Sequence, residues 1–329
     1  MSLPDVILDA LKGRSALVTG GTGMIGREVV RLLCDAGCEV TSVSLDEITV
    51  DSRARYVKGD LADFNFCMDL TKDTDLLLHV AGIKGSVVVT QERPADFMVP
   101  LLMMNTNILE AARRNGAQKI LYTSTIGAYA PAEVFAEDDY DVASEPMDAY
   151  AGWAKRVAEL QVQAYAHQYK MEHLAVVRPC NVYGPGDSFR PESAMVVPSL
   201  MSRVAAGEAP LKVWGDGSAI RDFAFSRDVA RGIIHALHYG TRGSFVNLGS
   251  GRGVSIKELV ETMAAIGGFE FVFDTSKPAG YPRRVMDVGR AKEWIDWTPS
   301  TSLHNGLKET WEWFTANPTE YLKRQNYFR

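Results

Sequence analysis

The stretch LVTGGTGMIGREVV, residues 17–30, joins an apolar strand pattern to a helical pattern through four glycines. The spacing satisfies G-x-G-x-x-G from Gly21 and G-x-x-G-x-x-G from Gly20. Glycines allow the backbone to turn tightly and approach a pyrophosphate, and the following helix N-terminus offers it free N–H groups. An ordinary strand-to-helix turn could also carry such glycines. Because this one opens the first such unit of the chain, it predicts a dinucleotide site at Gly20, Gly23, Met24 and Ile25.

Short β-branched runs alternate with helix-length segments through the first half of the chain. The runs occupy residues 39–45, 54–60, 75–82, 119–124 and 173–179. This alternation predicts an α/β protein with a Rossmann doubly wound parallel sheet. Beyond residue 180 the chain is richer in Gly, Pro and Arg, which indicates a smaller C-terminal α/β domain for the substrate. We expect residues 1–180 with about 221–248 to form the cofactor domain, and residues 181–220 with 249–329 to form the substrate domain.

The end of the second strand bears on the choice of cofactor. An acid there binds the adenosine ribose and favours NAD, whereas its absence with a nearby arginine favours NADP. Ser44 falls at the expected position, and Asp46 lies two residues on, so it points to the same side. Arg53 and Arg55 follow. NAD held by Asp46 is the prediction; Asp46 as a solvated loop residue, and NADP as cofactor, stay open.

Bulk composition narrows the class of protein. A net charge of -6 argues against a nucleic-acid-binding protein, which would carry a basic patch. The four cysteines lack metal-ligand spacing, so we expect reduced thiols and no metal site. The N-terminus has no signal-peptide pattern, and the most apolar run is interrupted by proline and asparagine. We therefore expect a soluble, cytoplasmic protein that does not bind a membrane.

Several motifs together resemble a known family. With the glycine turn, YTSTIGAY (122–129), Lys155 and RPCNVYGPGDSFRPES (178–193) resemble the extended short-chain dehydrogenase/reductase superfamily, the NAD-dependent epimerases, dehydratases and reductases of nucleotide sugars. Segments 81–86, 213–230, 247–259, 273–288 and 302–314 look like the GDP-L-fucose synthase branch. The resemblance implies a Rossmann domain, a small nucleotide-sugar domain, and a homodimer paired through two long helices, expected near residues 95–114 and 149–169.

The resemblance also implies roles for individual residues. Thr125 and Lys155 match catalytic positions, with Ser124 and Tyr150 beside them. Further cofactor contacts are implied at Asp60, Leu61, Ala81, Gly82, Lys155 and Pro179. Substrate contacts are implied at Asn181, Val197, Lys212, Trp214, Arg221, Lys277 and Arg283. A planar, bidentate arginine suits a diphosphate. A surface ion pair with Asp216 or Asp222 is the alternative for Arg221, and the tryptophans Trp214, Trp311 and Trp313 are expected in the core rather than against a base.

Two departures from the family argue against two of its reactions, dehydration and C3/C5 epimerisation. A 4,6-dehydratase of this superfamily carries Thr-Asp-Glu where this chain has Thr125, Ile126 and Gly127. The paired cysteine and histidine of the epimerising fucose synthases fall on Gly127 and Met195, which cannot carry a proton. The sequence thus argues against dehydration and against C3/C5 epimerisation.

A third departure concerns the Tyr-x-x-x-Lys pair. Ala151 stands four residues before Lys155, and the nearest tyrosine, Tyr150, stands one place too soon. Residues four apart share a helix face, whereas residues five apart diverge by roughly 140°. We expect Ala151 to face the site and Tyr150 to point away, unless a late helix start or a π-bulge turns Tyr150 inward. A further alternative is that a tyrosine at position 151 was deliberately replaced by alanine. Loss of a general acid commonly costs about 10²–10⁴ in rate, so activity can survive.

The pattern predicts an oxidoreductase at C4 of a nucleotide sugar, a GDP-hexose or GDP-heptose, that oxidises the 4-hydroxyl or reduces a 4-ketone. Two alternatives stay open: a C4 epimerase that retains NAD, and a catalytically weak nucleotide-sensing or scaffold protein. The second is disfavoured because a sensor would not need Thr125, Lys155, Asn181 and Arg221 together.

Overall fold

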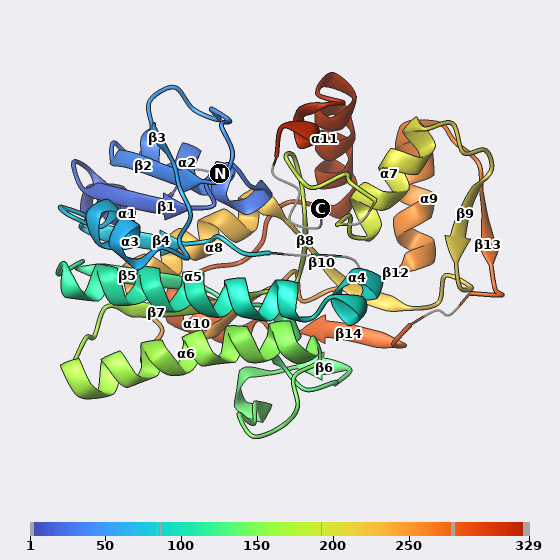
Figure 1. The fold of residues 1–329 in the computed structure, drawn as a ribbon. Helices are drawn as coiled ribbons and strands as arrows, with labels where there is room; N and C mark the ends of the chain where they lie inside the picture. The colour runs from blue at the N-terminus through green and yellow to red at the C-terminus, as the bar shows by residue number, and fades with distance from the viewer. Residues whose placement is uncertain (1–2, 84, 86, 192, 278–279, 325–329) are drawn as a thin grey trace.

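The computed structural model describes residues 3–83, 85, 87–191, 193–277 and 280–324 (Figure 1). A seven-stranded sheet with the order β11-β7-β5-β4-β1-β2-β3 organises the fold, and all of its pairings are parallel. Its strands are β1 (Ser15–Thr19), β2 (Glu39–Ser44), β3 (Arg55–Lys58), β4 (Leu76–His79), β5 (Lys119–Thr123), β7 (Leu174–Pro179) and β11 (Val246–Leu248). This confirms the predicted doubly wound α/β fold. The strand order reverses between β1 and β4, and ligands of such sheets bind at that switch point.

Helices cover both faces of the sheet. On one face α8 (Ser226–Tyr239) contacts α1 (Asp5–Leu11), α2 (Met24–Asp35) and α10 (Gly289–Ile295). On the other, α5 (Ala95–Arg114) lies between α3 (Phe64–Leu70) and α6 (Ala149–Tyr169), and the long helices α5 and α6 run side by side (Figure 1). Because both faces are covered, the central strands are continuous apolar runs such as LLL in β4, whose residues are all buried.

A second, smaller region stands beyond the carboxyl ends of the strands. Its five-stranded sheet has the order β12-β10-β14-β6 with β8 added to β10, and β9 pairs separately with β13. The strands are β6 (Val134–Phe135), β8 (Asn181–Tyr183), β9 (Leu211–Trp214), β10 (Ile220–Phe225), β12 (Gly253–Ser255), β13 (Phe271–Asp274) and β14 (Arg283–Met286). Its helices are α7 (Val196–Ala205), α9 (Ile256–Gly267) and α11 (Leu303–Ala316). The short helix α4 (Val87–Glu92) packs instead against α5, and the turn η1 (Ile126–Ala128) against α6. Two further 3-10 turns are η2 (Glu137–Asp139) and η3 (Glu320–Lys323).

Two hydrophobic cores match the two regions. The larger contains residues of six of the seven strands, all but β3, and of α8 and α10, and it extends past residue 248 to the buried Trp297. The smaller contains α7, β9, α9 and α11 around Phe189 and Met201. Strand β10 contributes to both, through Ala224 in the first and Phe223 in the second. The domain limits given above stay a prediction. No described helix has the length and apolar character that crossing a membrane requires.

Candidate active site

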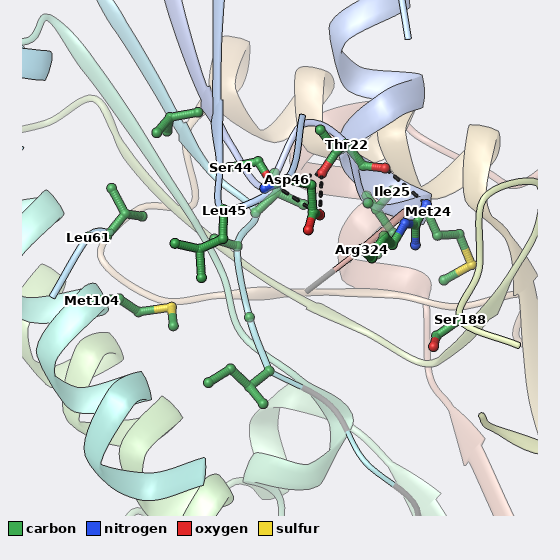
Figure 2. Close-up of a pocket in the computed structure, with 18 of the residues that line it drawn as sticks. Thr22, Met24, Ile25, Ser44, Leu45, Asp46, Leu61, Met104, Ser188 and Arg324 are labelled. Carbon is green, nitrogen blue, oxygen red and sulfur yellow. Dashed lines mark hydrogen bonds between the residues drawn. The ribbon is translucent and has the colours of Figure 1, made fainter. Parts of the chain in front are cut away.

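A pocket opens at the carboxyl ends of β1, β2 and β4, where the strand order reverses (Figure 2). Nine residues implicated by sequence line it: Gly20, Gly23, Met24, Ile25, Asp46, Asp60, Leu61, Ala81 and Gly82. Pro179, the last residue of β7, is buried and is not part of its lining. The first turn of α2 therefore lies beside the acidic end of β2, as a dinucleotide site requires.

Glycine is sterically required at two positions of this turn. Gly20 has φ of 68°, and a Cβ there would lie 2.8 Å from Ala81 Cα. A Cβ on Gly26 would lie 2.1 Å from the carbonyl oxygen of Gly20. Gly23 caps α2 and offers no side-chain hydrogen bond, so the first N–H groups of α2 are left for an anionic ligand.

A buried hydrogen-bond chain fixes the pocket wall. The Thr19 hydroxyl accepts from two backbone N–H groups, including that of Ala81, so it donates to Nδ1 of His79 at 2.7 Å. His79 Nε2–H then donates to Asn105 Oδ1 at 2.8 Å, and Asn105 donates to the Tyr122 hydroxyl. Burial lowers the pKa of His79 to about 3, so the ring is neutral. This series of hydrogen bonds fixes the positions of the four side chains and contains no charged group.

The ribose end of the pocket contains Asp46. Figure 2 shows its carboxylate pointing toward Thr22 and Ser44, whose hydroxyls donate to it at 3.1 and 3.3 Å. Arg53, in contrast, pairs with two aspartates on the surface, and Arg55 donates to a threonine of β2. Neither arginine lines the pocket.

Arg324, from the end of the described chain, also lines the pocket, and sequence reasoning missed it. Its guanidinium donates to the Thr22 carbonyl oxygen at 3.0 Å and lies 3.8 Å from Glu320, which also pairs with Arg27 (Figure 2). Arg190 donates to the Arg324 carbonyl at 3.1 Å. Burial and then Arg27 lower the pKa of Arg324 to about 10, so it stays charged at neutral pH. No motif precedes it in the sequence that would have identified it.

Lys155 is not part of the pocket lining but lies next to Gly82, which is. Its ammonium donates to the Thr123 carbonyl at 2.9 Å and lies 5.2 Å from the centre of the Tyr122 ring. A Cβ on Gly82, a pocket residue, would be 3.5 Å from its Nζ. Burial lowers the pKa of Lys155 to about 8, partly offset by Glu159. The amine can thus hold a ribose hydroxyl at the place where the pocket meets β5.

The two hydroxyl residues after β5 have different surroundings. Thr125 is half-buried, and its Oγ1 accepts from the Gly127 N–H at 3.1 Å. Ser124 is buried and donates to Glu159, which also accepts a bidentate pair from Arg178. Ser124 therefore belongs to an internal ion-pair network, whereas Thr125 follows two residues after Thr123, whose carbonyl accepts from Lys155.

The register of α6 separates the two residues before Lys155. The helix begins at Ala149 and continues without interruption to Tyr169. Tyr150 is 55% exposed, whereas Ala151 packs against the apolar cluster that contains Ile83 of the pocket wall. The helix thus has neither a π-bulge nor a start after Tyr150, and the outward orientation of Tyr150 stays a prediction.

A pair of arginines lies on β10 and β14, two neighbouring strands of the smaller sheet. The parallel register of β10 and β14 aligns Arg221 with Arg284, so both side chains leave the same face. Arg221 donates to two carbonyl oxygens at 2.6 and 2.7 Å, and Arg284 Nε is buried with no described hydrogen-bond partner. Burial lowers the pKa of both, and Arg284 lowers that of Arg221 further. Arg283 aligns with Ile220 and occupies the opposite face of β14, so the structure does not join it to Arg221.

The ion pair offered as the alternative for Arg221 is absent from the described contacts. Asp222 is fully buried and accepts from the N–H groups of Ser250, Gly251 and Met286. Asp216 accepts from Ser218. Arg284 was missed by sequence reasoning, because alternation along β14 can be used only when its register is known.

The remaining predicted substrate residues are scattered. Asn181 donates to the Asp222 carbonyl at 2.9 Å, Val197 is buried in the second core, and Lys212 is exposed on β9. Lys277 lies over the ring of Trp214 at 5.9 Å. The expectation that Trp214 lies in the core was wrong, because it is 57% exposed; Trp311 and Trp313 do pack against the second core.

Comparison with known proteins identifies the family. The NAD dependent epimerase/dehydratase family matches residues 16–249. The chain is 31% identical to a GDP-L-fucose synthase of Sinorhizobium fredii, over 96% of this chain and 99% of that protein. It is 31% identical to a dTDP-4-dehydro-6-deoxy-D-allose reductase of Streptomyces sp, over 93% and 98%. MoeE5, solved in complex with UDP-glucose and NAD, matches with a TM-score of 0.81 and 28% identity, over 92% and 99%. The chain belongs to the NAD dependent epimerase/dehydratase family of extended short-chain enzymes.

Proposed function

We propose that the protein is an NAD-dependent oxidoreductase that acts at C4 of a nucleotide sugar. The observation that carries this proposal is the order of groups along the site. The glycine turn and Asp46 line the pocket, and Lys155 lies next to its lining residue Gly82. Lys155 also donates to the Thr123 carbonyl, two residues before Thr125, and the Arg221–Arg284 pair stands on the paired strands β10 and β14. A dinucleotide and a sugar diphosphate would meet at Lys155 and Thr125.

The pocket residues fit NAD. The N–H groups at the start of α2 and the Arg324 guanidinium would hold its pyrophosphate, and Asp46 would accept from the ribose hydroxyls. A carboxylate there repels a 2′-phosphate, and Arg53 and Arg55 are held elsewhere. When bound, the nicotinamide accepts or supplies a hydride. Lys155 orients the nearby ribose through its ammonium, and Thr125 offers a hydroxyl to the sugar oxygen.

A GDP-linked hexose or heptose is the proposed substrate. Two same-facing arginines, neither of which forms a salt bridge with a described residue, suit a diphosphate, which accepts bidentate hydrogen bonds. Trp214, exposed beside Lys277, offers an aromatic face to the base. The GDP-L-fucose synthase relative favours guanine, and the dTDP-sugar reductase relative favours reaction at a 4-keto or 4-hydroxy carbon.

Simple redox is favoured over dehydration and C3/C5 epimerisation. Thr125, Ile126 and Gly127 provide no carboxylate at the dehydratase positions, and Met195, 38% exposed, provides no proton. A single carbon that gains or loses a hydride needs one proton carrier at its oxygen, rather than an additional acid and base for carbon–hydrogen exchange.

The test is a panel of GDP-, dTDP- and UDP-linked hexoses and heptoses, offered with NAD and, as 4-keto sugars, with NADH. We expect a change in nicotinamide absorbance with a GDP sugar, and a product that mass spectrometry finds two hydrogens lighter or heavier. A product of unchanged mass but inverted C4 would replace the proposal with C4 epimerisation. Binding of GDP without any product would replace it with a nucleotide-binding function.

We also propose a homodimer through the outer face of α5 and α6. Large apolar side chains are exposed at helical spacing there: Val99 and Met103 on α5, and Trp153, Val157 and Leu160 on α6. Contiguous exposed apolar surface of this kind marks a protein interface.

A further inference from the structure

A carboxylate fills the space that Gly127 leaves empty. A Cβ built on Gly127 would lie 1.8 Å from Asp148 Oδ2 and 2.3 Å from its Cγ. The Asp148 carboxylate therefore occupies the position that a side chain at residue 127 would take. Residue 127 is two places after Thr125, whose hydroxyl accepts from the Gly127 N–H. Sequence reasoning, which compared aligned positions only, found no proton carrier here.

The backbone holds Asp148 at this place. Its N–H donates to the Gly127 carbonyl at 3.1 Å, and its own carbonyl accepts from Gly152 at 3.2 Å. Close packing requires Gly152, because a Cβ there would lie 2.8 Å from the Gly127 carbonyl oxygen. The next residue, Ala149, has φ of 40°, a conformation that costs a non-glycine residue of order 1–3 kcal/mol and that clusters at functional sites.

The Asp148 carboxylate has Arg284 as a charged neighbour but no hydrogen-bond partner among the described residues. Asp148 is the N-cap residue of α6, where an aspartate usually accepts from the helix N–H groups, but its side chain makes no such bond. Within the described part of the chain it makes neither a hydrogen bond nor a salt bridge. The carboxylate lies against Gly127 and does not cap the helix.

Two cationic residues are relevant to Asp148, Arg284 on β14 and Lys155 on α6. Asp148 as a whole residue is exposed, but the atoms packed around its carboxyl desolvate it and raise its pKa, and Arg284 on β14 opposes that rise. On the other side α6 carries Lys155, seven residues after Asp148 in the chain. The turn η1 carries no charged residue. The sugar would join a diphosphate at Arg284 to a reacting carbon at Lys155 and Thr125, so Asp148 lies along its path.

We propose, resting on the C4 oxidoreductase function above, that Asp148 is the proton carrier of this enzyme in place of the absent tyrosine. In the oxidising direction its carboxylate accepts the proton of the C4 hydroxyl while the C4 hydrogen leaves as hydride to the nicotinamide. The O–H and C–H bonds break, the C=O bond forms, the sugar is oxidised and NAD is reduced. In the reverse direction the protonated carboxyl donates to the ketone oxygen.

The test compares Asp148→Asn with Glu145→Gln, a matched removal of an exposed carboxylate from the same loop. Asparagine keeps the size and capping capacity of the residue. We expect Asp148→Asn to lower turnover by about 10²–10⁴ with GDP affinity, measured by calorimetry, and thermal unfolding unchanged. Glu145→Gln should match the parent. Ala151→Tyr in the Asp148→Asn background should recover part of the turnover, since it restores a phenol four residues before Lys155.

The outcomes separate the two proposals. Turnover of the parent protein with unchanged turnover of Asp148→Asn would overturn the role of Asp148 and leave the oxidoreductase function standing. A parallel loss of turnover, GDP affinity and thermal stability would assign Asp148 to the start of α6 and overturn its role as well. Absence of any product from the parent across the sugar panel would overturn both proposals.

Discussion

Replacing Arg284 by alanine tests the substrate side most directly. Arg284 and Arg221 leave the same face of neighbouring strands, and burial already lowers the pKa of both guanidinium groups. A diphosphate would relieve that unfavourable arrangement by pairing with both cations. Loss of one hydrogen bond to a charged group costs about 1.5–3 kcal/mol, so GDP affinity should fall about tenfold to 150-fold. Isothermal calorimetry with GDP measures it without knowledge of the sugar.

The adjacent Arg283 is the matched control for this substitution. It precedes Arg284 in β14 and is equally half-buried, but it occupies the opposite face. Arg283→Ala should change GDP affinity by less than about twofold, as expected for a surface charge outside the contact. Equal losses in the two variants would contradict the strand register as the basis of recognition. Unchanged affinity in Arg284→Ala, with the fold intact, would remove the arginine pair from the diphosphate site.

Three other predictions follow from the cofactor pocket and the helix face. Asp46→Asn should weaken NAD more than NADP in fluorescence titrations, and tighter NADP binding by the parent would contradict the ribose assignment. Arg324→Ala should weaken NAD about tenfold or more, whereas the exposed neighbour Lys323→Ala should not; equal effects would remove Arg324 from the pyrophosphate site. Leu160→Asp should convert a dimer to a monomer in light scattering, and a monomeric parent would refute the α5–α6 interface.

The parallel sheet and the cofactor turn could be predicted because their signals are local. Apolar runs that alternate with helices determine the sheet, and steric need at Gly20 and Gly26 determines the turn. The exposure of Trp214 was also available from sequence, since Leu211 and Val213 alternate with Lys212 and Trp214 along one short strand. The prediction that Trp214 is buried did not use this alternation of apolar and polar residues.

The parts that sequence could not provide depend on long-range packing. Arg284 required the pairing of β14 with β10, over sixty residues away in the chain. Arg324 reaches the glycine turn across the whole length of the protein, as its contact with Thr22 shows. Asp148 required knowledge that Gly127 leaves a space and that α6 packs against it. No sequence period connects these residues.

The exchange of a phenol for a carboxylate has a consequence for the direction of catalysis. A tyrosine ordinarily titrates near 10 and is protonated at neutral pH, ready to donate to a ketone, whereas a carboxyl group titrates near 4. Desolvation raises the pKa of Asp148, but Arg284 limits the rise. At a pH above this pKa the group is a carboxylate, ready to accept the proton of a hydroxyl.

The rate of C4 oxidation should therefore increase as pH rises through the pKa of Asp148, and the rate of ketone reduction should decrease over the same interval. Initial rates in both directions, over a pH series that begins at the ordinary pKa of a carboxyl group and extends upward, measure this, and Asp148→Asn should lose both dependences. Parallel pH profiles in the two directions, or profiles that persist in Asp148→Asn, would show that another group carries the proton.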